Sequence, residues 1–123
     1  MMHLITGYSI AHNSPDHIYP SGTKRDNSRN AQFVIRLPLY IGKSPVSVLD
    51  MGCAGGGMVA DFIAAGHAAI GVEGSNYSYL IKRAAWAKIP KSLFTADATR
   101  KFVIYDDGSD ALLRNGDGDG GWC

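Results

Sequence analysis

The sequence of 123 residues predicts an α/β fold in which strands and helices alternate around a parallel sheet. Two mainly apolar runs without regular polar alternation, Val46–Leu49 and Ala68–Glu73, are typical of strands buried on both faces. A stretch with helical spacing follows each run, and residues 92–97 form a third strand candidate. Right-handed crossovers then give half of a doubly wound parallel sheet with the spatial strand order 3-2-1.

The segment before the first strand, residues 1–44, is predicted to be an N-terminal arm followed by a helix. Residues 1–30 are rich in Asn, Ser, Pro, Asp and Gly and have no sustained period, which indicates a surface loop. A helix could begin with Asn27 or Ser28 as its N-cap, and Pro38 should end or kink it.

The first helix of the core region, residues 45–105, is expected directly after the glycines at 52–57. Val59, Phe62 and Ile63 fall on one helical stripe and should face the sheet. Gly66 occupies the position just past the helix end, where glycine is favoured.

The second helix is predicted within "SNYSYLIKRAAWAKIP", with Ser75 or Asn76 as its N-cap and its end before Pro90. Its spacing predicts that five side chains face inward: Tyr77, Leu80, Ile81, Ala84 and Ala85. Beyond Asp97, "KFVIY" could form one more short strand, and residues 106–123 are expected to be a flexible tail rich in Gly and Asp.

The composition argues against several functions. Twelve basic and eleven acidic residues leave a net charge of +1, so we expect no nucleic-acid partner. No apolar stretch is long enough to span a membrane, and we expect no membrane partner. Cys53 and Cys123 do not form a CxxC pair, and the four histidines lack metal-ligand spacing, so we expect no metal and a cytoplasmic location.

The glycines and acids at the strand ends indicate a ligand site. Residues 52–57 should expose backbone N–H groups to a ligand lying across the carboxyl ends of the strands. Asp50, Glu73 and Asp97 end three successive strands. Glu73 could accept hydrogen bonds from both hydroxyls of a ribose, and Asp97 could accept one from an adenine amino group. Together these features favour a nucleoside ligand.

The stretch Asp50-Met51-Gly52-Cys53-Ala54-Gly55-Gly56, with Glu73 and Asp97, resembles the first three motifs of class I S-adenosylmethionine-dependent methyltransferases. The first motif of that family is D/E-x-G-x-G-x-G, and Ala54 replaces its middle glycine. The resemblance implies a Rossmann-like sheet and S-adenosylmethionine as cofactor. It places the glycine loop against the amino-acid portion, Glu73 at the ribose, and Asp97 with the backbone of Ala98 at the adenine. The implied cofactor-binding residues are Asp50, Gly52, Cys53, Ala54, Gly55, Gly56, Glu73, Gly74, Asp97 and Ala98.

A nicotinamide-dinucleotide oxidoreductase is the closest alternative, because Gly52-x-Ala54-x-x-Gly57 fits a degenerate GxGxxG motif and Glu73 suits its ribose acid. The dinucleotide motif, however, requires neither an acid before the first glycine nor an acid after the third strand. The glycine that lets the backbone approach the pyrophosphate is also the one that Ala54 replaces.

The resemblance covers residues 46–99, and it implies a sheet that continues beyond the third strand. Residues 100–123 contain no convincing fourth strand, so the chain resembles the cofactor-binding half of a methyltransferase, truncated or diverted at its C-terminus. No general base is evident, and the methyl acceptor is unknown, with a small molecule favoured. A non-catalytic cofactor-binding module or fragment is a further alternative. Without a fourth strand, the first strand would be an exposed apolar edge of the sheet, which predicts marginal stability or self-association of the chain.

Overall fold

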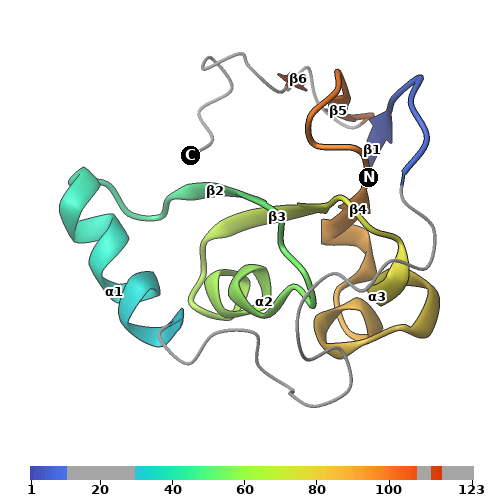
Figure 1. Ribbon diagram of the computed structural model, residues 1–123. Helices are drawn as coiled ribbons and strands as arrows, with labels where there is room; N and C mark the ends of the chain where they lie inside the picture. Colours follow the sequence, from blue (N-terminus) through green and yellow to red (C-terminus); the bar gives the residue numbers. More distant parts are fainter. Residues whose placement is uncertain (11–29, 108–111, 115–123) are drawn as a thin grey trace.

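The computed structural model describes residues 1–10, 30–107 and 112–114, with two three-stranded sheets and short helices among them (Figure 1). One sheet is parallel and lies beside α1 and α2, and the other is antiparallel and lies toward the N-terminus. No helix in these ranges has the length and apolar character needed to cross a membrane.

The parallel sheet consists of β2 (Ser47–Met51), β3 (Ala68–Glu73) and β4 (Leu93–Thr95), with β3 in the middle. This confirms the predicted parallel strands and their 3-2-1 order. The predicted bounds of β3 are also correct. Asp50, however, lies one residue inside β2 and faces Gly71 across the sheet, so it does not end the strand.

Helix α2 (Gly57–Ala64) fastens the parallel sheet to the helical layer as predicted. Val59 and Phe62 are fully buried, and Ile63 packs against the same core. Gly66 follows the C-cap residue Ala65 and adopts a left-handed conformation with φ +90°. The N–H of Gly66 donates to Ile63 and the N–H of His67 to Phe62, which is the hydrogen-bond pattern of a Schellman motif.

Helix α1 (Asn30–Ile41) packs on α2, with the rings of Phe33 and Phe62 edge to face at 5.8 Å. The helix continues through Pro38 to Ile41, so the predicted end at this residue is wrong, whereas the alternative of a kink there stays a prediction. Proline removes one N–H donor, but Val34 of the preceding turn is anchored in the core, so packing outweighs that loss. The predicted N-caps Asn27 and Ser28 lie outside the described residues.

The predicted second helix is broken into short pieces. Helix α3 (Tyr77–Ile81) stops where Lys82 adopts φ +53°, and a 3₁₀ helix, η1 (Ala84–Ala87), follows. The turn is held by Arg83, whose Nε donates to Ser78 Oγ at 3.0 Å. Ala85 is buried as predicted, whereas Leu80 and Ile81 are 52% and 53% exposed, so their predicted inward orientation is wrong.

A second 3₁₀ helix, η2 (Pro90–Ser92), leads directly into β4. The strand is shorter than the predicted range 92–97, and it ends two residues before Asp97. Residues 96–100 then form a turn in which the N–H of Arg100 donates to the carbonyl of Asp97 at 3.1 Å. Asp97 therefore follows the strand and does not end it.

The antiparallel sheet joins β1 (Met2–Ile5), β5 (Val103–Asp106) and β6 (Leu112–Arg114), in the order β1-β5-β6. The predicted strand in "KFVIY" is confirmed as β5. The prediction of a loop is wrong for Met2–Ile5, which form a strand. Strand β6 lies within the predicted tail. The other residues of that tail from 108 onward are not described. Apolar side chains of β1 and β5 cover the face of β3 that carries Ile70 and Val72.

Gly71 lets the loop after β2 lie directly on β3. A Cβ atom at this position would lie 2.7 Å from Cβ and Sγ of Cys53 and 2.9 Å from Cγ2 of Val59. We therefore expect Gly71→Ala to lower the free energy of unfolding by about 2 kcal/mol in urea denaturation. Gly7→Ala is the matched control, because nothing lies within 4 Å of its added Cβ. Equal stabilities of the two variants would contradict this account of Gly71.

Candidate functional site

The loop of residues 52–56 leads from β2 into α2 and has three left-handed residues. Gly52 has φ +82°, Ala54 +48° and Gly56 +79°. Glycine adopts such angles freely, whereas they cost alanine about 1 kcal/mol. A side chain at Gly56 would also lie 2.7 Å from Leu93 Cδ1. The glycines are therefore required by the path of the loop, and Ala54 is its strained member.

The N–H groups of this loop are largely used within the protein. Those of Gly52 and Cys53 both donate to the carbonyl of Val72, at 2.7 and 3.1 Å, and that of Gly56 donates to Cys53 at 2.8 Å. The N–H of Ala54 donates to a side chain. The expectation that the loop exposes free N–H groups is therefore wrong for these four residues, because their donors shape the loop itself.

Glu73, the last residue of β3, joins the loops that follow two adjacent strands. Its Oε1 accepts a hydrogen bond from the N–H of Ala54 at 3.1 Å, and its Oε2 accepts one from the N–H of Ser75 at 3.1 Å. The side chain is only 7% exposed. The glycine loop and the predicted ribose acid thus lie in direct contact at the carboxyl edge of the sheet.

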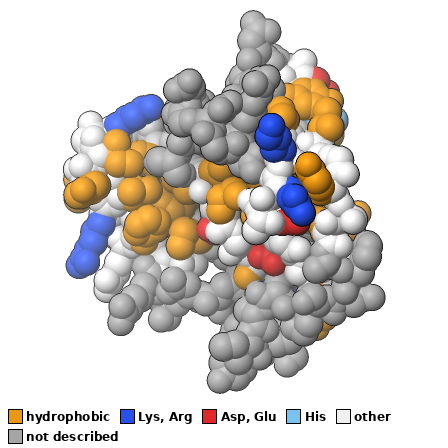
Figure 2. Space-filling model, turned by 45° about the horizontal axis from the view of Figure 1, so that its top comes forward, with side chains coloured by type: hydrophobic (Ala, Val, Ile, Leu, Met, Phe, Trp, Pro, Cys, Tyr) orange, Lys and Arg blue, Asp and Glu red, His pale blue; other side chains and the backbone are white. Residues whose placement is uncertain are grey.

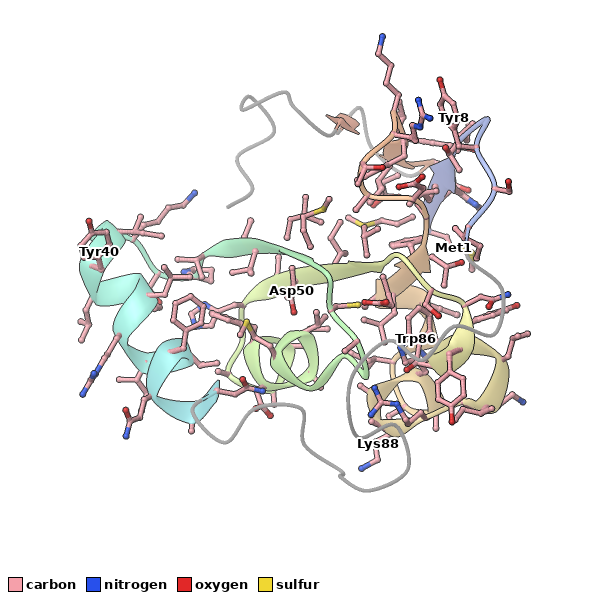
Figure 3. The ribbon with its side chains drawn as sticks, in the orientation of Figure 1. Met1, Tyr8, Tyr40, Asp50, Trp86 and Lys88 are labelled. Atoms are coloured by element: carbon pink, nitrogen blue, oxygen red, sulfur yellow. The ribbon has the colours of Figure 1, made fainter. Side chains whose placement is uncertain are left out.

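The 3₁₀ helix η1 covers the glycine loop. The indole Nε1 of Trp86 donates to the carbonyl of Ala54 at 2.8 Å, and the N–H of Ala85 donates to the carbonyl of Gly55 at 2.9 Å. Figure 3 shows Trp86 beside the loop that runs from β2 into α2. Trp86 is not among the site residues that the sequence singled out. The need of a buried indole N–H for an acceptor was the available signal.

Asp97 lies at the neighbouring strand end, in the turn after β4. Its Oδ1 accepts hydrogen bonds from the N–H of Thr99 at 2.9 Å and from its Oγ1 at 2.6 Å. These bonds, the hydroxyl first, lower the pKa of Asp97 below its ordinary value. The N–H of Ala96 donates to the carbonyl of Glu73 at 3.0 Å, which ties this turn to the end of β3.

The other predicted site residues are distributed along the same edge. Gly74 lies between Glu73 and Ser75, and Ala98 lies half-buried in the Asp97 turn. Cys53 is buried against Gly71, which explains its small size and leaves its thiol no access to a substrate. Asp50 is half-buried within β2, the edge strand of the parallel sheet, and is labelled in Figure 3.

Helix α1 exposes apolar side chains at a distance along the surface from this edge. Ile35, Leu39 and Tyr40 are exposed, the last two by 77% and 91%. In Figure 2 an apolar area lies at the left, and acidic side chains lie nearer the centre. The exposed apolar side chains of α1 therefore form a region apart from the candidate site.

Comparison with protein-family models finds no matching family, and comparisons with curated proteins and with solved structures find no significant match. The glycine loop, Glu73 and Asp97 define the candidate site by their geometry alone.

Removing the hydroxyl of Thr99 should raise the pKa of Asp97 toward its ordinary value of 3.8, because that hydroxyl makes the largest contribution to the shift. Thr99→Val tests this expectation, and Thr99→Ser, which keeps the hydroxyl, is the matched control. Titration of the Asp97 carboxyl carbon by NMR measures the change.

The hydrogen bond between the Thr99 hydroxyl and Asp97 also affects the stability of the fold at acid pH. The pKa of Asp97 is lower in the folded than in the unfolded chain, so its stabilisation is complete above the unfolded pKa and is lost as pH falls through the folded value. Between about pH 5 and about pH 2, the native chain should therefore lose more stability than Thr99→Val. An equal loss in both proteins would count against the role of this hydroxyl.

Proposed function

We propose that this chain is the cofactor-binding part of an S-adenosylmethionine-dependent methyltransferase with a Rossmann-like sheet. The observation that carries the proposal is the 3.1 Å contact between the N–H of Ala54 and the carboxylate of Glu73. It sets a glycine-rich loop after one parallel strand against an acid at the end of the next. An acid at that position serves the ribose of a nucleotide ligand. The resemblance to class I methyltransferases places the amino-acid portion of the cofactor at the glycine loop.

In this proposal the cofactor lies across the carboxyl ends of β2, β3 and β4, where ligands of open parallel sheets bind. Residues 52–56 border its amino-acid portion, Glu73 and Gly74 hold the ribose, and Asp97 with Ala98 meets the adenine. Because the carboxylate of Glu73 accepts the N–H of Ala54, we expect the ribose to bind Glu73 while this contact is kept. The amide signal of Ala54 should then report binding.

The chemistry that the cofactor supplies is a methyl group activated by the adjacent sulfonium. The described residues bind and orient it, and orientation lowers the barrier of the transfer. A general base is not among the assigned residues, and a small-molecule acceptor remains the favoured class. A module that binds the cofactor without transferring its methyl group fits the same contacts. We expect a cytoplasmic location.

Association between copies of the chain is part of the same proposal. Within the described residues β2 lies at the edge of the parallel sheet. The neighbouring α1 exposes Leu39 and Tyr40. An apolar edge strand beside exposed apolar side chains favours pairing with another chain.

Calorimetric titration of the full chain separates the candidate cofactors. We expect S-adenosylmethionine and S-adenosylhomocysteine to bind and NAD not to bind. The left-handed Ala54 supports this expectation, because its methyl group stands where a dinucleotide motif has the glycine that admits the pyrophosphate. Binding of NAD alone, or of none of the three ligands, would overturn the proposal.

Glu73→Gln should weaken the binding of S-adenosylhomocysteine by at least about tenfold, because an amide group offers the ribose and the loop fewer acceptors. Asp61→Asn is the matched control, because it removes a carboxylate from α2 outside the glycine loop. Thermal melts of both variants verify that they are folded. Undiminished affinity in a folded Glu73→Gln variant would exclude Glu73 from the site.

A further inference from the structure

Ala54 is held by side chains at both of its peptide groups. Its N–H donates to Glu73 Oε1 at 3.1 Å, and its carbonyl accepts from Trp86 Nε1 at 2.8 Å. The first partner ends β3, and the second belongs to η1. The residue between them has φ +48°, an angle that disfavours alanine. Two distant elements therefore stabilise the strained member of the loop.

We infer that Trp86 is a positioning residue that makes alanine compatible with a left-handed position of the glycine loop. Its indole is 3% exposed, so its N–H requires an acceptor within the protein. The acceptor is the carbonyl of the one loop residue whose backbone angle is strained. This bond adds a favourable interaction that is available only while Ala54 keeps its left-handed conformation.

The break in the predicted second helix is what brings the indole to this place. Lys82 and Ala84 both have positive φ, at +53° and +49°, and between them the chain turns from α3 into η1. The N–H of Ala85 then donates to Gly55 at 2.9 Å, next to the bond made by Trp86. Adjacent residues of η1 thus bind adjacent carbonyls of the loop, which fixes the direction of the indole N–H.

The consequence for the ligand rests on the proposed function. Because the N–H of Ala54 contacts Glu73, Trp86 also restricts the orientation of the carboxylate that is proposed to hold the ribose. Trp86 acts through Ala54 and has no role in contacting the ligand. Replacing Trp86 should therefore have little effect on ligand binding when residue 54 is glycine, which adopts the left-handed conformation without strain.

A double-mutant cycle of Trp86→Phe and Ala54→Gly tests this inference. Phenylalanine keeps an aromatic ring in the core and lacks the N–H, whereas glycine adopts the left-handed angle without strain. With Ala54 present, Trp86→Phe should weaken the binding of S-adenosylhomocysteine about tenfold. In the Ala54→Gly background, the same change should weaken binding by no more than about twofold. An equal loss in both backgrounds would show that Trp86 only packs, and would overturn the inference.

Ile89→Val supplies the matched control for lost packing. Ile89 packs against the same core cluster as Trp86 and donates no side-chain hydrogen bond. Its effect should be the same with Ala54 present and in the Ala54→Gly background. Coupling of equal size for Ile89→Val would mean that the cycle measures general loosening of the cluster, and would also overturn the inference.

The inference can be tested even if S-adenosylhomocysteine does not bind. In that case the proposed function fails, and the cycle is measured as urea unfolding of the same four proteins. Trp86→Phe should then lower the unfolding midpoint more with Ala54 present than in the Ala54→Gly background. Hydrogen exchange at the amide of residue 54 should accelerate only when that residue is alanine. Additive midpoints with unchanged exchange would refute the positioning role independently of any ligand.

Discussion

The carbonyl of Val72 determines how the chain leaves β2. By accepting the N–H groups of both Gly52 and Cys53, it turns the backbone over β3 at the point where the parallel pairing ends. Cys53 then fits over Gly71, which has no side chain to oppose it. Ala54 consequently reaches Glu73, at the end of the same strand that accepted the loop. Without this turn, the loop could contact neither Glu73 nor η1 in the observed geometry.

The features that the sequence predicted are those set by local patterns. Short, mainly apolar runs identified β2 and β3, a helical stripe identified the buried face of α2, and Gly66 identified its end. The errors lie where distant contacts override local preference. Pro38 is tolerated because its helix is packed on α2. Met2–Ile5 forms a strand because it pairs with β5, which lies about a hundred residues later in the sequence. The four-residue strand carries too little pattern to reveal such a partner.

The candidate site was predictable in its residues more than in its hydrogen bonds. Parallel strands bring their carboxyl ends to one edge of the sheet. The closeness of the glycine loop and Glu73 therefore followed from their positions at the ends of successive strands. The hydrogen-bond partners of the loop's N–H groups could not be predicted. Every residue has a backbone carbonyl, so the sequence does not show that the carbonyl of Val72 is the acceptor. Trp86 was missed for the same reason: its acceptor is a backbone atom, and the turn at Lys82 that delivers it has no simple sequence signature.

The pairing of β1 with β5 also bears on the order in which the chain can fold during synthesis. The apolar face of β3 that carries Ile70 and Val72 is covered by Ile104 and Leu4, which come from opposite ends of the described sequence. The ribosome therefore releases β3 well before the residues that complete its cover. Until β5 emerges, a nascent chain presents a finished parallel strand with one bare apolar face, the kind of surface that chaperones recognise during translation.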